Sequence, residues 1–300
     1  MANVNTLIIT DFDIPTNTIN EILVDRLDLN KEDTYDIVSW PNFSSILASK
    51  KSTMEDNLIK NYLFYTIGKL IIIHPSIKNI AYLFPHLESS RHFSNIFSHH
   101  YPNILIEPLI YIVKNNHIKF YDSEKVYNKY CEPIVNFRCS DGRLSKIYAN
   151  SLITSENPLK VNLGYNICLP GSTLWTTLSE ERKILIGEIV DEIKKKNIQK
   201  VIIDHHGPDC DAFMSYHRIE GEIEQERSRI QHRINIENAW DIFSKLDVDV
   251  NARYLELNGD KIVEYTYKME PMQKIDVDSI KNHGFDFCNH IFTESQTILV

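Results

Sequence analysis

Two short polar clusters in this sequence bring together residue types that bind transition metals. The first is Cys139-Ser140-Asp141-Gly142-Arg143, with a thiol, a carboxylate and a guanidinium at alternate positions. The second lies further along the chain and contains His205, His206 and Cys210. Two thiolates and one imidazole are a ligand set that zinc accepts, and three protein ligands leave a fourth position for water. The sequence therefore predicts a zinc site made of both cysteines and one of the two histidines.

Each cluster directly follows a short apolar run that predicts a buried strand. Pro133–Phe137 precedes the first cluster, and Lys200–Ile203 precedes the second. In an open α/β sheet, ligands bind outside the carboxyl ends of the strands. We therefore expect the ends of these two strands to deliver both clusters to one place.

The predicted elements occur twice in the same order. The first series contains strands at Thr6–Thr10, Tyr35–Val38 and Lys69–Ile73, a helix around Leu58–Ile67, and a hairpin over Ile104–Tyr121. The second series contains strands at Pro133–Phe137, Tyr165–Cys168 and Lys200–Ile203, a helix around Ile184–Ile193, a long polar helix within Glu220–Leu246, and a hairpin over Val248–Tyr267. The fold class expected is α/β, with a mostly parallel sheet flanked by helices and two tandem copies of one unit.

Local matches support this duplication. Tyr35-Asp-Ile matches Tyr165-Asn-Ile, and Lys69-Leu-Ile-Ile-Ile-His74 matches Lys200-Val-Ile-Ile-Asp-His205. The alternative is that βα units look alike whatever their origin. We predict a degenerate N-terminal copy at 1–126, without a metal site, and a zinc-binding C-terminal copy at 127–300.

The two predicted copies differ where chemistry would take place. Asp11 stands where the second copy has Cys139, and Asn79 stands roughly where Cys210 would be. The first copy keeps His74, which we expect to be structural, and it has no cysteine. Only the second copy can therefore bind a thiolate-ligated metal. Asp209 is expected to be a turn residue.

The composition excludes several function classes. The 300 residues carry a formal net charge of −9 and no block rich in Lys and Arg, which argues against a nucleic-acid binder. The start of the chain does not resemble a secretory signal, and no apolar run is long enough to span a bilayer. Five cysteines are few and odd in number, which fits a reducing compartment better than a disulfide framework. We expect a cytoplasmic protein that does not act at membranes.

The two clusters carry a family resemblance. Cys139-Ser-Asp-Gly-Arg143 resembles the Cys-x-Asp-x-Arg motif of β-class carbonic anhydrases, and His205/His206 with Cys210 resemble that family's His-x-x-Cys segment. The resemblance covers about Tyr130 to Lys268. The chain departs from the pattern in two ways: four residues separate His205 from Cys210, or three separate His206 from it, and Asp211 replaces the usual glycine.

The resemblance implies a fold, an activity and roles for the residues. It implies a pseudo-dimer within one chain, compatible with further homo-oligomers, and a zinc lyase that hydrates carbon dioxide to bicarbonate by a metal-bound hydroxide. In the family, the aspartate matched by Asp141 pairs with the arginine matched by Arg143 and orients the nucleophile, or becomes the fourth metal ligand when the arginine releases it. Two alternatives stay open. One is a non-catalytic zinc-binding structural or regulatory protein, and the other is a zinc hydrolase of a related molecule such as carbonyl sulfide or carbon disulfide.

Overall fold

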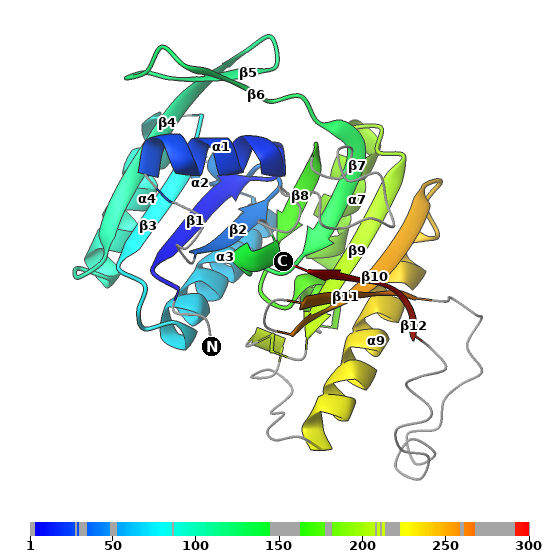
Figure 1. Cartoon of the computed structure of the whole chain (residues 1–300). Coiled ribbons are helices and arrows are strands. Elements are labelled where there is room, and N and C mark those ends of the chain that lie inside the picture. The colour runs from blue at the N-terminus through cyan, green and yellow to red at the C-terminus, as the bar shows by residue number, and fades with distance from the viewer. Residues whose placement is uncertain are drawn as a thin grey trace.

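The computed structural model describes residues 4–27, 29, 35–48, 53–85, 87–144, 163–177, 182–207, 209–210, 212–213, 223–258, 261–267 and 292–299. Within these ranges the strands form one twelve-stranded sheet with helices on both faces (Figure 1). The first six strands are β1 Thr6–Asp11, β2 Tyr35–Trp40, β3 Asn79–Phe84, β4 Leu105–Lys114, β5 His117–Phe120 and β6 Val126–Asn128. The other six are β7 Glu132–Arg138, β8 Gly164–Cys168, β9 Lys200–Gly207, β10 Asp249–Asn258, β11 Lys261–Tyr267 and β12 Phe292–Leu299.

The strand order reads the same outward from the middle of the sheet. The order is β12-β11-β10-β9-β7-β8-β2-β1-β3-β4-β5-β6, so each half runs second, first, third, fourth, fifth, sixth. The four inner strands of each half pair in parallel, and the halves meet where β2 and β8 pair antiparallel. The expected α/β class with a parallel sheet core is confirmed.

Backbone hydrogen bonds at the junction repeat between the halves. The Ser140 N–H donates to the carbonyl of Leu169, and the Ile37 N–H donates to the carbonyl of Ser140. In the other half, the Phe12 N–H donates to the carbonyl of Trp40, and the Asn166 N–H donates to the carbonyl of Phe12. Phe12 and Ser140 therefore occupy equivalent places, which puts Asp11 at the position of Cys139.

The predicted strand at Lys69–Ile73 is wrong. These residues are the last turns of α3, Met54–Ile73, and the third strand of this half is β3. A capping box starts α3, because Thr53 accepts from the Asp56 N–H and Asp56 accepts from the Thr53 N–H. A short apolar run inside a long, capped helix cannot be told from a buried strand by its composition. The match of Lys69–His74 to Lys200–His205 is therefore wrong in space.

Helices cover both faces of the sheet. The remaining helices are α1 Thr16–Leu27, α2 Phe43–Ala48, α4 Leu87–His100, α7 Arg182–Lys195, α9 Ile223–Phe243 and the 3-10 helix η1 Ser172–Thr177. Alternation along β1 shows the layers, because Ile8 packs in one buried cluster with residues of α1 while Ile9 packs in another with residues of α3 and α4.

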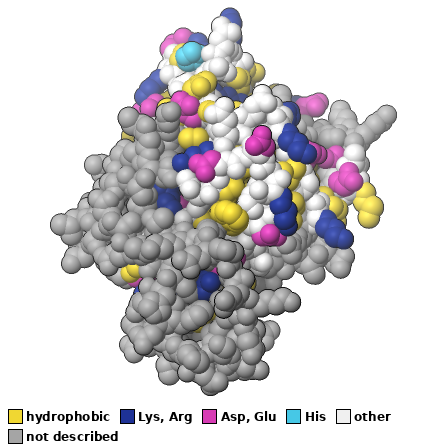
Figure 2. Space-filling view, turned by 90° about the vertical axis from the view of Figure 1, so that its right-hand side faces the viewer, with side chains coloured by type: hydrophobic (Ala, Val, Ile, Leu, Met, Phe, Trp, Pro, Cys, Tyr) yellow, Lys and Arg dark blue, Asp and Glu magenta, His cyan; other side chains and the backbone are white. Residues whose placement is uncertain are grey.

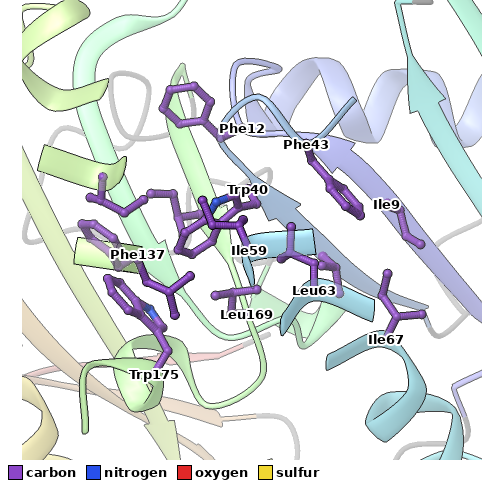
Figure 3. Close-up of a cluster of buried hydrophobic side chains, with 14 of the residues drawn as sticks. Ile9, Phe12, Trp40, Phe43, Ile59, Leu63, Ile67, Phe137, Leu169 and Trp175 are labelled. Carbon is purple, nitrogen blue, oxygen red and sulfur yellow. The ribbon is translucent and has the colours of Figure 1, made fainter. Parts of the chain in front are cut away.

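One core continues beneath the junction of the halves. Trp40 at the end of β2 meets Trp175 of η1 edge to face, with ring centroids 5.6 Å apart (Figure 3). Phe12, Ile59 and Leu63 from the first half join the same cluster as Phe137 and Leu169 from the second. This shared packing fixes the strand ends of one half against the other, and the polar cluster lies at those ends.

Candidate metal centre

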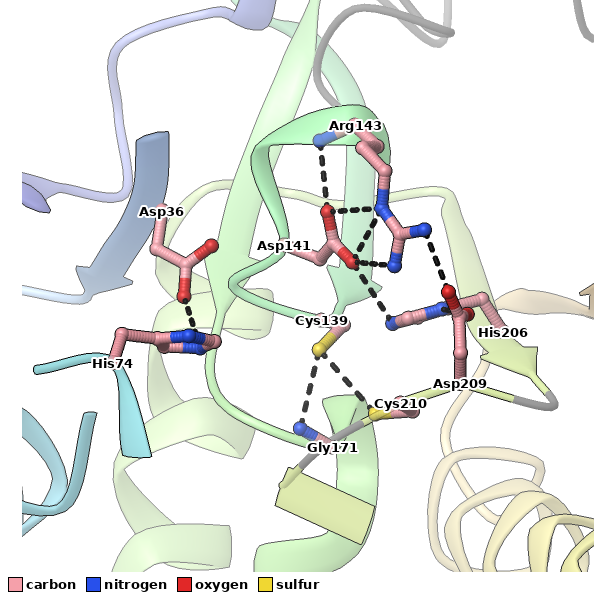
Figure 4. Close-up of polar contacts among 9 residues, drawn as sticks. All are labelled: Asp36, His74, Cys139, Asp141, Arg143, Gly171, His206, Asp209 and Cys210. Atoms are coloured by element: carbon pink, nitrogen blue, oxygen red, sulfur yellow. Dashed lines mark hydrogen bonds and ion pairs between the residues drawn. The ribbon is translucent and has the colours of Figure 1, made fainter. Parts of the chain in front are cut away.

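Two strand ends bring three metal-binding side chains together. Cys139 directly follows β7, His206 lies near the end of β9, and Cys210 is in the segment after it (Figure 4). The sulfur atoms of the cysteines are 3.7 Å apart, and one ligand atom from each of the three residues lies within 4.8 Å of the others. All three side chains are buried. This group could bind a metal ion.

The alternation of β9 separates the two adjacent histidines. Val201 and Ile203 face the main core, and His205 points the same way, where its ring nitrogens contact Thr173 at 2.7 Å and His232 of α9 at 2.9 Å. His206 points to the opposite face, toward the cysteines. The structure thus brings His206 to the thiols and holds His205 away in a separate hydrogen-bonded pair.

The chemistry of these side chains fits a metal ion. Both ring nitrogens of His206 are buried, and neither has a hydrogen-bond partner of standard geometry among the described residues. The nearest carboxylate oxygens, of Asp141 and Asp209, lie 3.8 Å and 3.9 Å from these nitrogens and compensate only in part for the lost hydration, whereas a metal bond would satisfy the imidazole. Two soft sulfur donors and one imidazole suit zinc and other soft transition metals.

Close backbone approaches set the first cluster in place. A Cβ atom added to Gly142 would lie 1.8 Å from the backbone oxygen of Tyr35, so only glycine fits there. Gly171 has a φ of +74° and donates its N–H to the sulfur of Cys139 at 3.3 Å. Through these two close contacts, the Cys139–Arg143 cluster packs against the segment after β8 and against strand β2 of the other half.

The guanidinium of Arg143 contacts both carboxylate oxygens of Asp141, an arrangement called here the Asp141–Arg143 fork. Its Nε lies 3.1 Å and 3.0 Å from the two carboxylate oxygens, and its terminal nitrogen NH2 lies 2.5 Å from Oδ2. The same guanidinium donates to Asp209 at 2.7 Å. Asp141 Oδ2 is 3.8 Å from His206 Nε2, so the carboxylate lies directly beside the three candidate ligands. The turn residue Asp209 thus has a second role, as a partner of Arg143.

The side chains of this group shift one another's pKa values. The hydrogen bond from Cys210 and the neighbouring His206 bring the pKa of Cys139 well below its ordinary value, and the same bond raises the pKa of Cys210. Burial lowers the pKa of His206, but the charges of Cys139 and Asp141 outweigh it and raise that pKa. Burial raises the pKa of Asp141, but His206 and Arg143 outweigh it and lower that pKa. In the metal-free protein one thiol of the pair ionises first, and a bound metal would take both as thiolates.

A small cavity joins this group to the first half. The cavity has a volume of about 30 Å³, and about 10–15 Å³ suffices for one water molecule. Cys139, Asp141 and His206 line one side, while Asp36 of β2 and His74 after α3 line the other. Asp36 Oδ2 lies 3.5 Å from His74 Nε2, and burial together with Asp141 raises the pKa of Asp36 well above its ordinary value. The cavity can hold a molecule of a few atoms.

The equivalent positions in the first half carry other side chains. Asp11 replaces Cys139, and its carboxylate accepts the N–H and the hydroxyl hydrogen of Ser44. The register of β1 with β3 and of β7 with β9 equates Tyr82 with Ile203, so Pro85 takes the place of His206. The prediction that Asn79 stands near the place of Cys210 is wrong, because Asn79 begins β3 and its counterpart is Lys200. Within the described residues, no Cys/His cluster occurs in the first half.

The sequence interpretation identified the candidate ligands but not the residues on the opposite side of the cavity. Cys139, His206, Cys210, Asp141 and Arg143 are brought together as expected. Asp36 was not singled out, and His74 was matched to His205 rather than placed in this cavity. The antiparallel pairing of β2 with β8 would have been the signal for both, and local sequence does not reveal it.

Comparisons with known proteins add no assignment. No protein-family model matches this chain, and no curated protein matches it. None of the helices in the described ranges combines the length and apolar character needed to cross a membrane. Lys and Arg side chains are interspersed with Asp and Glu over the described part of the face in Figure 2, without a patch of one sign.

Proposed function

We propose that this protein binds zinc through Cys139, His206 and Cys210 and hydrates carbon dioxide to bicarbonate, as a relative of the β-class carbonic anhydrases. One observation carries the proposal: the buried Cys/His/Cys group lies beside an Asp141–Arg143 fork in a cavity for a few atoms. The sequence resemblance rests on the same residues, and their proximity in the fold supports it.

Zinc would supply acidity, since it lowers the pKa of a bound water molecule from about 15.7 toward about 7. Asp141 would accept a hydrogen bond from such a water molecule, since its Oδ2 lies 3.8 Å from His206 Nε2 and therefore beside the candidate ligands. Arg143 fixes the rotamer of this carboxylate through contacts to both oxygens. The carboxylate of Asp141 would thereby orient the reacting water molecule toward a substrate in the cavity.

The cavity suits a small neutral substrate. Two thiolates neutralise the charge of a divalent ion, so the loaded site attracts anions weakly. Val4, Leu70 and Ile73 form an apolar part of the wall. With a volume of about 30 Å³, the cavity matches a molecule of a few atoms, such as a linear molecule of three atoms.

We also infer that the two halves arose by tandem duplication. The identical strand order of each half and the repeated hydrogen bonds around Phe12 and Ser140 support this origin. The predicted boundary between residues 126 and 127 falls inside β6, Val126–Asn128, and a boundary after residue 128 would keep that strand whole. The first half then acts as a built-in partner, in place of a second subunit.

One feature favours a non-catalytic zinc protein instead. Arg143 also donates to Asp209, so a shift of the guanidinium toward Asp209 would release Asp141. A released Asp141 could take the fourth ligand position and exclude water. Carbonyl sulfide and carbon disulfide are further candidates as substrates because they share the linear triatomic shape.

Stopped-flow measurement of carbon dioxide hydration by zinc-loaded protein tests the proposal. We expect hydration above background in the wild type and none in Cys139→Ser. Asp141→Asn should keep zinc but lower turnover by about 100-fold, as for other losses of a group aimed at the transition state. Zinc-loaded wild type without activity above Cys139→Ser would refute the enzyme. Release of sulfide from carbonyl sulfide, without carbon dioxide hydration, would favour the hydrolase.

A further inference from the structure

The far wall of the metal cavity belongs to the other half of the chain and carries a polar pair. Asp36 comes from β2, and His74 is the residue that ends α3. Both are buried, at 4% and 9% exposure, and both line the cavity with the candidate metal ligands. Asp36 Oδ2 and His74 Nε2 are 3.5 Å apart, and Figure 4 shows the pair across from Cys139. The rest of this wall is apolar, so the pair is its one acid–base unit among the described residues.

The backbone ties this pair to the metal cluster. Ile37, next to Asp36, donates its N–H to the carbonyl of Ser140 at 2.7 Å, and Asp36 forms an isolated bridge with Asp141. The Cβ that Gly142 lacks would strike the carbonyl of Tyr35. Strand β2 is therefore locked against the Cys139–Arg143 segment, and the position of Asp36 relative to the cavity is fixed.

Hydration of carbon dioxide requires a group that accepts the released proton. The balanced reaction is CO₂ + H₂O → HCO₃⁻ + H⁺, in which a C–O bond forms and one O–H bond of water breaks. Among the described residues of the C-terminal half that line the cavity, each titratable side chain is either a candidate ligand or part of the Asp141–Arg143–Asp209 network. Arg143 is a cation held by Asp141 and Asp209, and His206 would be a ligand.

We propose that His74 accepts the proton released in each cycle and passes it to a buffer base, with Asp36 as the residue that positions the imidazole. This inference rests on the proposed hydration activity. Among the described residues that line the cavity, His74 is the one imidazole outside the candidate ligand set. Histidine is the side chain best suited to take up and release protons near neutral pH.

The charged neighbours of His74 are consistent with this role. Asp36 faces it from β2, and Asp141 with its cation Arg143 faces it from the segment after β7. The thiols, His206 and Asp209 line the remaining part, where a bound zinc would place a positive charge. An ionised carboxylate on this side would favour an imidazolium and a bound metal ion on the other side would oppose it, so His74 lies between two opposing influences.

The equivalent place in the other half contains different chemistry. Tyr165 is the counterpart of Asp36, as the paired hydrogen bonds of Asn166 and Ile37 show, so the predicted match of Tyr35 to Tyr165 is wrong by one residue. The Lys196 ammonium lies over the Tyr165 ring, 5.5 Å from its centroid. Lysine and tyrosine do not exchange protons readily near pH 7. The acid–base pair thus occurs on the one side of the junction that faces the Cys/His/Cys group.

The test compares His74→Ala and Asp36→Asn with His99→Gln, a control on the exposed end of α4. In zinc-loaded protein at low buffer concentration, we expect kcat of His74→Ala to fall by at least about 10-fold while kcat/KM changes little, because proton release follows the conversion of carbon dioxide. Added imidazole should restore kcat. Equal loss in both parameters without rescue would overturn the proposal and assign a structural role.

A second readout does not depend on activity. The Cε1–H resonance of His74, assigned by its loss in His74→Ala, should titrate between pH 5 and 9 in the zinc-loaded wild type and shift its midpoint in Asp36→Asn. A resonance that does not titrate overturns the proposal even if hydration is observed. Absence of hydration with a titrating His74 overturns the proposed function and, with it, the role of His74 in turnover. Circular dichroism of each variant verifies folding.

Discussion

The two halves of this chain share a strand order but differ at the ends of the equivalent strands. Cys139 and His206 in the second half correspond to Asp11 and Pro85 in the first, and Asp36 corresponds to Tyr165. One half thus carries the soft metal-binding groups, while the other closes the cavity over them. The difference shows that one sheet architecture supports a candidate site or a supporting wall, depending on a few residues at the strand ends.

The substitution Cys139→Ser should have the largest effect on the difference between the two halves, because it removes a candidate metal ligand. Replacing a thiolate by a hydroxyl should lower zinc affinity by at least about 100-fold, beyond the roughly 10–100-fold typical for loss of an outer partner of a ligand. Competition with a chromophoric chelator measures this affinity. Cys131→Ser is the matched control, because that thiol contacts the backbone oxygen of Asp13 in the other half. Equal zinc binding by the Cys139 variant and the wild type would contradict the site.

The adjacent histidines provide a comparison within one strand. His206→Ala should lose zinc as Cys139→Ser does. His205→Ala should keep zinc within about 10-fold but lower the free energy of unfolding by about 1–3 kcal/mol, since its buried partners Thr173 and His232 lose a hydrogen bond. Zinc titration and urea unfolding separate the two effects. The reverse pattern would make His205 the ligand.

A pH dependence should distinguish Asp11 from its counterpart Cys139. Burial, above all, raises the pKa of Asp11 from 3.8 to about 7. Between these values the folded state binds the proton that the unfolded state has released, so this group's stabilisation falls as pH rises, by up to about 1.4 kcal/mol per pH unit, and is lost above pH 7. Asp11→Asn should flatten this decline in urea unfolding between pH 4 and 8. If the free energy of unfolding of Asp11→Asn depends on pH as steeply as that of the wild type, the decline does not come from Asp11.

Two glycines should respond in opposite directions to the same substitution. Gly142→Ala forces a methyl group against the Tyr35 carbonyl and should cost about 1–3 kcal/mol in the free energy of unfolding, with loss of zinc affinity. Gly187→Ala in α7 meets no atom within 4 Å and should stabilise the protein by about 0.5–1 kcal/mol. Urea unfolding compares the two variants. If Gly142→Ala leaves the free energy of unfolding unchanged, the two halves are not locked together at this point.

The sequence predicted the strands before both clusters because apolar runs followed by polar ligands are a strong local signal. It did not distinguish His205 from His206, since strand direction alone does not say which face of β9 meets the cysteines. It misassigned Lys69–Ile73 because the last four residues of α3, Leu70–Ile73, are all apolar. Asp36 and His74 stayed undetected because they reach the cavity through the β2–β8 pairing, which is a long-range contact.

X-ray absorption at the zinc edge of the loaded wild-type protein tests the central claim most directly. The account predicts two sulfur neighbours at about 2.3 Å and two lighter neighbours at about 2.0–2.1 Å, one of them from His206 and lost in His206→Ala. Zinc surrounded only by nitrogen and oxygen, or protein that binds no zinc at all, would contradict it.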